Sequence, residues 1–333
     1  MKKTMLFLVT LLAAFSLVAA SCGDDDDPAA IAERDCDAGT EGEGIRVAIV
    51  APSGENDLAF TQSIVDGVDC LEGVSEVAIT PGTFIVEDAG VALRQYAEDG
   101  YDLVVGHGSQ YGGLIQEIAA DFPNTAFAWG TAVDTFGLPN VSAYTAASNE
   151  GGYVLGRAAA ELGSNVGIVG PIEVGDAKLY VDGFRLGAEA GGAEVNVVYI
   201  ESFADVQLAS ETATGFVSNG ADILTGTAQM TVGAISVAEN EGIPWFGTQS
   251  NQTGAAADGV VVANQVYRWE VALQQLVDDI NDGDLGGSSY EINLENGGLG
   301  IEYGNGDVSD DITDLVNSTV EEVIAGDVGT TVG

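Results

Sequence analysis

Short apolar runs alternate along the chain with longer segments in which apolar residues recur every three or four positions. The run Val47–Ala51 predicts a strand buried on both faces. After a polar turn, Phe60, Ile64 and Val68 recur at helical spacing. A strand, a loop and a helix in this order form the opening half of a βαβ unit.

The same alternation continues through most of the chain. Further strands are predicted at Val74–Thr80, Tyr101–Gly106, Ala126–Trp129, Val141–Thr145, Val166–Val169, Val195–Ile200, Ile223–Thr227, Pro244–Gly247 and Val260–Val262. Helices are predicted between them at Asp88–Glu98, Tyr111–Asp121, Glu150–Leu162, Ala177–Ala190, Val206–Val217, Val232–Glu241 and Trp269–Asn281. Two short β segments, Glu291–Leu294 and Gly300–Tyr303, precede a last helix at Ile312–Ile324.

Strands that alternate with helices of this length indicate an α/β protein with parallel sheets and right-handed crossovers. About nine parallel strands are too many for one open sheet, so we expect two doubly wound domains. The break between them is expected near Thr145–Asn149, where a strand ends and a new helix begins.

The N-terminus has the pattern of an export signal. Lys2 and Lys3 precede the apolar run Met5–Val18, which is short for a membrane span. Ala19-Ala20-Ser21-Cys22 resembles a bacterial lipobox, which implies cleavage after residue 21 and lipid attachment to Cys22. The alternative is an ordinary signal peptide with an incidental cysteine. Residues 22–44 are acidic and lack periodicity, so we interpret them as a tether.

The charge of the chain is strongly negative, with 9 Lys and Arg against 52 Asp and Glu and a formal net charge of −43. Such a surface repels nucleic acid, so we expect no nucleic-acid partner. Our hypothesis for the excess of carboxylates is solubility in salt-rich surroundings, because carboxylates stay hydrated there.

Two cysteines follow Cys22, namely Cys36 and Cys70. An exported chain meets an oxidising compartment, where one pair of cysteines can form a structural disulfide, and we expect one that ties the tether to the domain. Two cysteines and the single His107 make no ligand set with recognisable spacing, so we expect neither a metal site nor a cofactor.

The ends of the predicted strands supply candidate binding residues, because parallel sheets bind ligands beyond their carboxyl ends. Asn56, Asp57, Phe60 and Gln62 follow the first strand. The alternative is that Phe60 is a core residue and that Asn56 and Asp57 only begin the helix. His107 lies between two glycines after a buried strand, which makes it a candidate ligand contact.

An enzyme is the main rival class of protein. The chain has no G-x-S-x-G motif, and any His-based triad would have to use His107. Gly106-His107-Gly108 lacks the third glycine of a dinucleotide-binding fingerprint. We therefore expect that the protein is not an enzyme.

Several segments between Ile45 and Gly304 resemble the basic membrane protein (BMP) lipoproteins, which are purine-nucleoside-binding receptors of ABC importers with the type I periplasmic-binding-protein fold. They are NDLAFTQSIVDGV, DLVVGHGSQYGGLIQEIAADFPNTAFAWG, NVSAYTAASNEGGYVLGRAAA, VDGFRLGAEA, YIESFADVQLASETATGFVSNGADIL, FGTQSNQ and ENGGLGIEY.

The resemblance implies that a base is stacked between aromatic rings in the cleft between the domains. Asp57 and Phe60 match the acid and the ring of the first loop, and Phe203 matches the second ring, with Asp205 beside it. The remaining matched positions depart from the family, since amides, hydroxyls and aromatic rings stand where it has acids, a late-loop lysine and, at Gln229, a glycine-rich stretch. They are Ser109, Tyr111, Gln229, Gln249, Asn251 and Tyr267. We therefore expect a neutral, ring-containing ligand.

The resemblance also implies a hinge that the chain crosses three times. Domain one is expected to comprise residues 45–146 with about 265–285, and domain two residues 147–264 with about 286–333. The implied protein is an extracytoplasmic, lipid-anchored monomer that delivers a small ligand to an ABC permease. The alternatives are a sensory protein that docks on a membrane receptor, or an importer receptor for a sugar or another metabolite.

Overall fold

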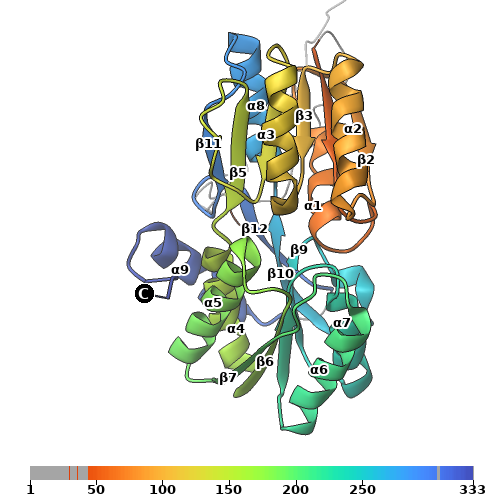
Figure 1. The fold of residues 1–333 in the computed structure, drawn as a ribbon. Coiled ribbons are helices and arrows are strands. Elements are labelled where there is room, and N and C mark those ends of the chain that lie inside the picture. Colours follow the sequence, from red (N-terminus) through yellow and green to blue (C-terminus); the bar gives the residue numbers. More distant parts are fainter. Residues whose placement is uncertain (1–29, 31–35, 37–43, 306–307, 333) are drawn as a thin grey trace, which may run out of the picture.

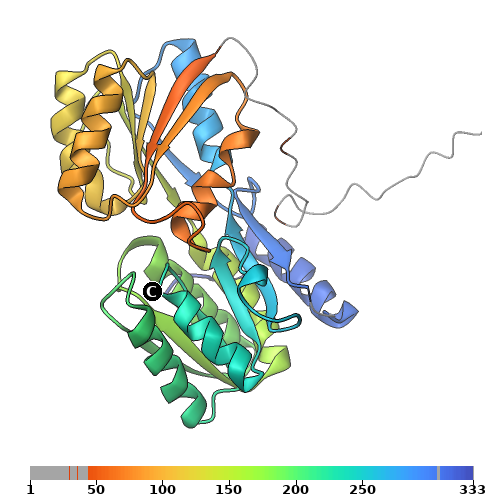
Figure 2. The same cartoon turned by 90° about the vertical axis from the view of Figure 1, so that its right-hand side faces the viewer.

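The computed structural model describes residues 30, 36, 44–305 and 308–332. These residues form two lobes, each built on a six-stranded sheet flanked by helices (Figures 1 and 2). The predicted class, two doubly wound α/β domains, is confirmed. The predicted signal peptide and Cys22 lie outside the described residues. Among the described helices, none is both long and apolar enough to cross a membrane.

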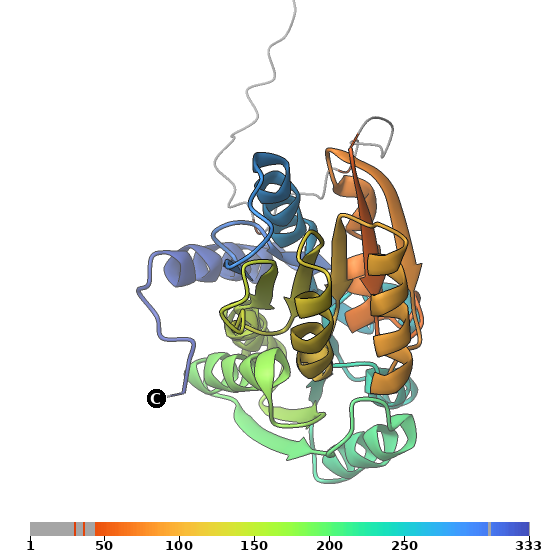
Figure 3. The ribbon, with the colours of Figure 1, turned by 45° about the horizontal axis from the view of Figure 1, so that its top comes forward.

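The first lobe is an all-parallel sheet in the order β11-β5-β4-β3-β1-β2. Its strands are β1 (Ile45–Val50), β2 (Val74–Thr80), β3 (Leu103–Gly106), β4 (Ala126–Gly130), β5 (Val141–Ala146) and β11 (Ser289–Ile292). Its helices are α1 (Phe60–Val65), α2 (Val86–Glu98), α3 (Gly112–Asp121) and α8 (Glu270–Asp282). Helices α2 and α3 pack on one face of the sheet, and α1 and α8 pack on the other (Figure 3).

The second lobe has the sheet order β12-β10-β9-β8-β6-β7, in which β12 is antiparallel to β10 and the other pairs are parallel. Its strands are β6 (Asn165–Gly170), β7 (Glu194–Tyr199), β8 (Ile223–Gly226), β9 (Trp245–Gln249), β10 (Val261–Tyr267) and β12 (Leu299–Tyr303). Its helices are α4 (Ser148–Leu162), α5 (Gly175–Ala190), α6 (Val206–Ser218), α7 (Thr231–Glu241) and α9 (Asp310–Ile324).

The chain crosses between the two sheets after β5, after β10 and again between β11 and β12. Two expected boundaries differ from the structure. Strand β11 pairs with β5 in the first lobe, although residues 286–333 were assigned to the second domain. Strand β10 stays in the second sheet through Tyr267, just beyond the expected boundary at about 265. Both differences arise because the pairing of a short strand depends on a distant partner, which periodicity along the chain does not reveal.

Glycines let helices α4 and α5 of the second lobe pack with their backbones almost touching. A Cβ atom on Gly156 would lie 2.1 Å from the carbonyl oxygen of Phe184, and one on Gly187 would lie 2.1 Å from that of Tyr153. These glycines belong to the segments NEGGYVLGRAAA and GFRLGAEA, which carried the family resemblance. Their physical role is this close packing, because a side chain at either position would separate the helices.

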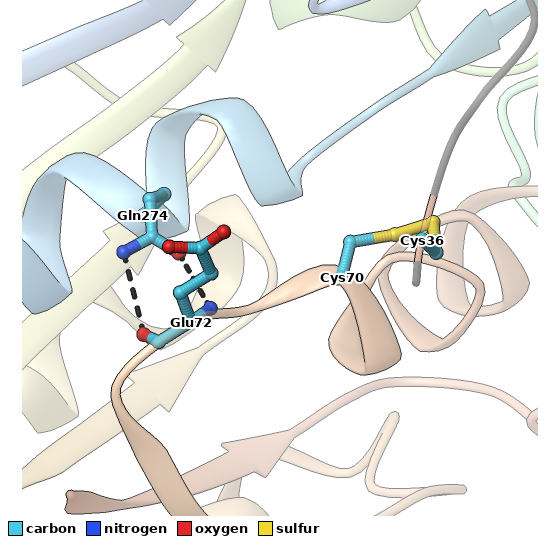
Figure 4. Close-up of a disulfide and its surroundings, with 4 residues drawn as sticks. All are labelled: Cys36, Cys70, Glu72 and Gln274. Carbon is cyan, nitrogen blue, oxygen red and sulfur yellow. Dashed lines mark hydrogen bonds between the residues drawn. A yellow bond between two sulfur atoms is a disulfide. The ribbon is translucent and has the colours of Figure 1, made fainter. Parts of the chain in front are cut away.

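Cys36, within the segment expected to be a tether, is joined to Cys70 of the first lobe by a disulfide, which has the pairing that we expected (Figure 4). The rest of that segment lies outside the described residues, apart from residues 30 and 44. Just beyond the disulfide, Gln274 of α8 forms two hydrogen bonds with Glu72. The Glu72 backbone N–H donates to Gln274 Oε1 at 2.9 Å, and Gln274 Nε2 donates to the Glu72 carbonyl at 3.3 Å. These contacts fix the segment before β2 to a helix from a much later part of the chain.

Candidate functional site

A cavity lies between the lobes, at the carboxyl ends of their parallel strands. It encloses about 440 Å³ of space, which includes its open mouth. Its lining residues from the first lobe are Pro52, Phe60, Phe84, Gly108, Ser109, Gln110 and Thr131. Those from the second lobe are Asp176, Ala177, Phe203, Ala228, Gln229 and Gln249.

Two of the predicted aromatic residues line this cavity from opposite lobes. Phe60 begins helix α1, where it is 8% exposed. Phe203 lies in the loop between β7 and α6 and is half-buried. The structure thus brings together two rings that are 143 positions apart in the sequence (203 − 60). Their predicted role in binding a ligand stays a prediction.

His107 supports Phe60 from behind and does not line the cavity. The two rings stack with their centroids 3.9 Å apart and their planes 7° apart. His107 Nε2 faces the Phe60 carbonyl oxygen at 3.1 Å, and Nδ1 faces the Tyr144 hydroxyl at 2.7 Å. A carbonyl oxygen can only accept, so Nε2 carries the proton and Nδ1 accepts from Tyr144. Burial lowers the pKa of His107 to about 3, so the ring is neutral.

The predicted acid of the first loop, Asp57, holds the start of helix α1. Its carboxylate accepts hydrogen bonds from the backbone N–H groups of Ala59, Thr61 and Gln62 at 2.9–3.1 Å, and from the Ser53 hydroxyl. These donors occupy the carboxylate, because the first N–H groups of a helix have no partner within it. Asp57 is therefore a helix cap outside the cavity, as the alternative interpretation of this loop had it.

Asp205, expected beside the second ring, also caps a helix. It is exposed, and its Oδ1 accepts from the Leu208 N–H at 2.9 Å at the start of α6. Asn56 is exposed, and Gln62 Oε1 accepts from the Leu58 N–H at 3.0 Å. None of these side chains lines the cavity.

Three other predicted residues also lie outside the cavity lining. Tyr111 is buried in the first lobe, where its hydroxyl donates to the Thr83 carbonyl at 2.8 Å. Asn251 is exposed and donates to Glu302 at 2.9 Å. Tyr267, expected in a loop, is the last residue of β10 and fully buried. The apolar run was predicted to end at Val262, but pairing with β9 and β12 extends the strand.

The cavity lining includes three more of the predicted residues, namely Ser109, Gln229 and Gln249. Their roles in binding a ligand stay predictions. Gln229 also links the lobes, because its Nε2 donates to the Ser53 hydroxyl oxygen at 3.0 Å. Gln249 is 3% exposed and has left-handed backbone at φ 74°. Thr131 and Ala228 share this conformation, with φ of 54° and 72°. Such backbone is unfavourable for these residue types and often occurs at binding sites.

The acid that reaches the cavity is Asp176, which the sequence reasoning missed. It lies in the first turn of α5 and is 8% exposed. Burial raises its pKa to about 6, although the side chains of Tyr267 and Gln249 and nearby backbone N–H groups oppose this shift. The sequence contained a signal for this residue. Asp176 lies at the start of the helix that follows the first strand of the second domain, which is a common place for a ligand-binding residue. Among the described residues, no cluster of three or more His, Cys, Asp or Glu side chains could hold a metal ion.

Comparison with known proteins gives consistent matches. The profile of the Bmp family, described as ABC transporter substrate-binding protein PnrA-like, matches residues 45–327. The chain is 23% identical to the ABC transporter nucleoside-binding protein BmpA of Lactococcus lactis, covering 98% of both chains. It is 29% identical to a purine-binding protein of Brucella abortus over 53% of this chain and 51% of that one. A solved ABC transporter solute-binding protein of Conexibacter woesei superposes with a TM-score of 0.72 at 26% identity, covering 86% of this chain and 98% of that chain.

Proposed function

The chain belongs to the Bmp family of PnrA-like ABC transporter substrate-binding proteins, and from this premise we propose that it binds a nucleoside-like ligand between Phe60 and Phe203. Family and fold are those of solute-binding proteins, which act outside the cytoplasm and pass a small ligand to an ABC permease. The proposal adds the class of the ligand and the residues that hold it.

The position of the two rings is the observation that carries the proposal. Phe60 and Phe203 line one cavity from different lobes, so a flat heterocycle between them would contact both lobes at once. Each stacked ring contributes about 0.5–1.5 kcal/mol beyond the burial of apolar area. A ligand that contacts both lobes binds the closed arrangement better than an open one and therefore shifts the protein towards closure.

Two further observations support a nucleoside-like ligand. Two relatives are named for nucleoside and purine binding. The cavity lining also presents the amides of Gln110, Gln229 and Gln249, which offer donors and acceptors to a neutral polar ring.

A thermal-shift screen of the purified protein tests this function. Nucleosides, free bases, pentoses and glucose are each added at about 1 mM, because a ligand at about 100 times its dissociation constant stabilises the folded state by about 2.7 kcal/mol. A rise of the melting midpoint with nucleosides or bases supports the proposal. A rise with the sugars alone contradicts the proposed class of ligand. The absence of a rise with every compound in the panel contradicts it as well.

We also propose that the protein is anchored through a lipid on Cys22. The lipobox pattern before this residue supports the anchor. Replacing the cysteine, Cys22→Ala, is expected to remove the protein from the membrane fraction of producing cells. Retention of the variant in that fraction would contradict the anchor.

A further inference from the structure

Two buried hydrogen-bond acceptors in the cavity wall have no hydrogen-bond partner among the described residues. They are Oδ2 of Asp176, from the first turn of α5, and Oε1 of Gln249, at the end of β9. Both side chains line the cavity, and both residues are more than nine-tenths buried. Buried polar atoms in folded proteins nearly always have a partner, so an unpartnered pair in a cavity wall points to a bound molecule that supplies donors.

The charges around the cavity limit the kind of molecule that it can bind. Among the described residues that line it, Asp176 is the one ionisable residue, and none is Lys, Arg or His. Lys178, two residues further along α5, donates instead to Asp182 at 2.6 Å and contacts Glu173 at 3.3 Å. A phosphate or carboxylate would therefore meet a carboxyl group with no cation to offset it. A ligand with N–H donors could instead form hydrogen bonds with the unpartnered oxygens of Asp176 and Gln249.

The two acceptors lie close enough to act together. Gln249 and the Tyr267 hydroxyl lie beside the Asp176 carboxyl, where both favour its charged form against the effect of burial. On the other side, the Ser148 hydroxyl donates to the backbone carbonyl of Asp176 at 2.6 Å, which fixes the start of the helix.

We propose that Asp176 and Gln249 form an acceptor pair that binds the N–H edge of the ligand's ring. The class of ligand is a neutral heterocycle with an exocyclic amino group next to a ring N–H, as in guanine, and without a phosphate. The inference rests on the proposed function, since Phe60 and Phe203 hold the faces of the same ring whose edge the acceptors bind. According to this inference, Asp176 determines the selectivity among ring-containing ligands, because stacking alone does not distinguish one flat ring from another.

Calorimetric titration with four probes tests the acceptor pair, namely guanosine, inosine, adenosine and guanosine 5′-phosphate. Guanosine and inosine differ only in the exocyclic amino group. Loss of one hydrogen bond to a charged group weakens binding by about tenfold or more. We therefore expect guanosine to bind at least tenfold more tightly than inosine, adenosine or guanosine 5′-phosphate.

The variant Asp176→Asn keeps the size of the side chain but replaces one acceptor oxygen of the carboxylate by an NH2 donor and removes its charge, so it is expected to abolish the preference for guanosine over inosine. Glu173→Gln is the matched control, because it removes one negative charge from an exposed site three residues before Asp176 and should keep the preference. A thermal midpoint of the Asp176→Asn variant at or above that of the unaltered protein shows that the fold is retained, since the substitution removes a buried charge.

The outcomes separate this inference from the proposed function. Equal binding of guanosine and inosine by the unaltered protein, with no effect of Asp176→Asn, overturns the acceptor pair and leaves the nucleoside-binding function standing. It would also mean that water satisfies the two acceptors. No binding of any of the four probes overturns the inference together with the proposed ligand class.

Discussion

The ring of His107 lies flat against the ring of Phe60, with centroids 3.9 Å apart and an angle of 7° between the planes. Behind this pair lie Tyr144 and Trp269, whose ring is edge-on to Phe60, His107 and Tyr144. The Trp269 indole N–H donates to the Ser63 hydroxyl oxygen at 2.9 Å. The wall of the cavity is therefore one face of a buried aromatic cluster, which holds the Phe60 ring in place before a ligand arrives.

Replacing the supporting ring, His107→Ala, should destabilise the protein by about 3 kcal/mol. It removes a stacked ring from the core and leaves the Tyr144 hydroxyl without its acceptor. Urea unfolding at pH 7 measures the loss. Tyr144→Phe removes the hydrogen bond alone and should cost about 1–2 kcal/mol. The double variant should lose less than the sum of the two, because the side chains contact each other. Full additivity would mean that the two rings act independently.

The pH dependence of stability should reveal two buried groups that act in opposite directions. Unfolded histidine binds a proton below pH 6.5, whereas folded His107 does so only near pH 3, so its effect lowers stability as the pH falls through this range. Folded Asp176 keeps its proton up to about pH 6, whereas the unfolded carboxyl loses it near 3.8, so its effect lowers stability as the pH rises through that range. Between about pH 4 and 6 the two effects should largely cancel.

Single substitutions should separate these two effects. Compared with the unaltered protein, Asp176→Asn should gain stability as the pH rises from 4 to 6 and keep this gain above pH 6. The cost of His107→Ala should instead be largest above pH 6.5 and should shrink at lower pH. Unfolding measured at unit pH steps from 4 to 7 gives both differences. A constant difference for either variant would mean that the group does not titrate differently in the folded and unfolded states.

Removing the second ring, Phe203→Ala, should weaken ligand binding by more than about tenfold while changing stability little. The ring is half-buried and lies in a loop, so its loss opens no core cavity. Titration with the ligand found in the thermal-shift screen measures the effect, and Phe203→Tyr, which keeps the ring, is the control. Phe60→Ala should weaken binding to a similar extent and should also lower stability, because Phe60 packs on His107. Unchanged affinity in both alanine variants would refute the placement of the ligand between these rings.

Breaking the disulfide, by Cys36→Ser or by reduction, should lower stability by about 2–4 kcal/mol. The bond joins residues 34 positions apart, and a cross-link over such a loop restricts the unfolded chain by about this amount. Thermal unfolding with and without reductant measures the loss. In the Cys36→Ser, Cys70→Ser double variant, the reductant should have no further effect. A single melting midpoint for oxidised and reduced protein would show that the bond does not form in solution.

Local patterns in the sequence determined the elements, because a buried strand or an amphipathic helix repeats its apolar residues at a fixed spacing. Strand β2 spans Val74–Thr80 in both prediction and structure. The close packing of α4 on α5 was also encoded locally, in the glycines of two helical segments. The two-domain α/β class follows from the order of such elements and needs no long-range information.

Only the tertiary structure decided which side chains form the cavity. Asp57, Asp205 and Asp176 are all acids that follow a strand. The carboxylates of Asp57 and Asp205 accept hydrogen bonds from backbone N–H groups at the start of a helix. One carboxylate oxygen of Asp176 is instead buried without a partner among the described residues. His107 follows a strand as a pocket residue would, yet the chain places it behind Phe60. The pairing of β11 with β5 likewise joins segments far apart in the sequence. The physical reason is the same in each case: periodicity fixes which face of an element is apolar, while the partner of a polar side chain depends on what the rest of the chain brings beside it.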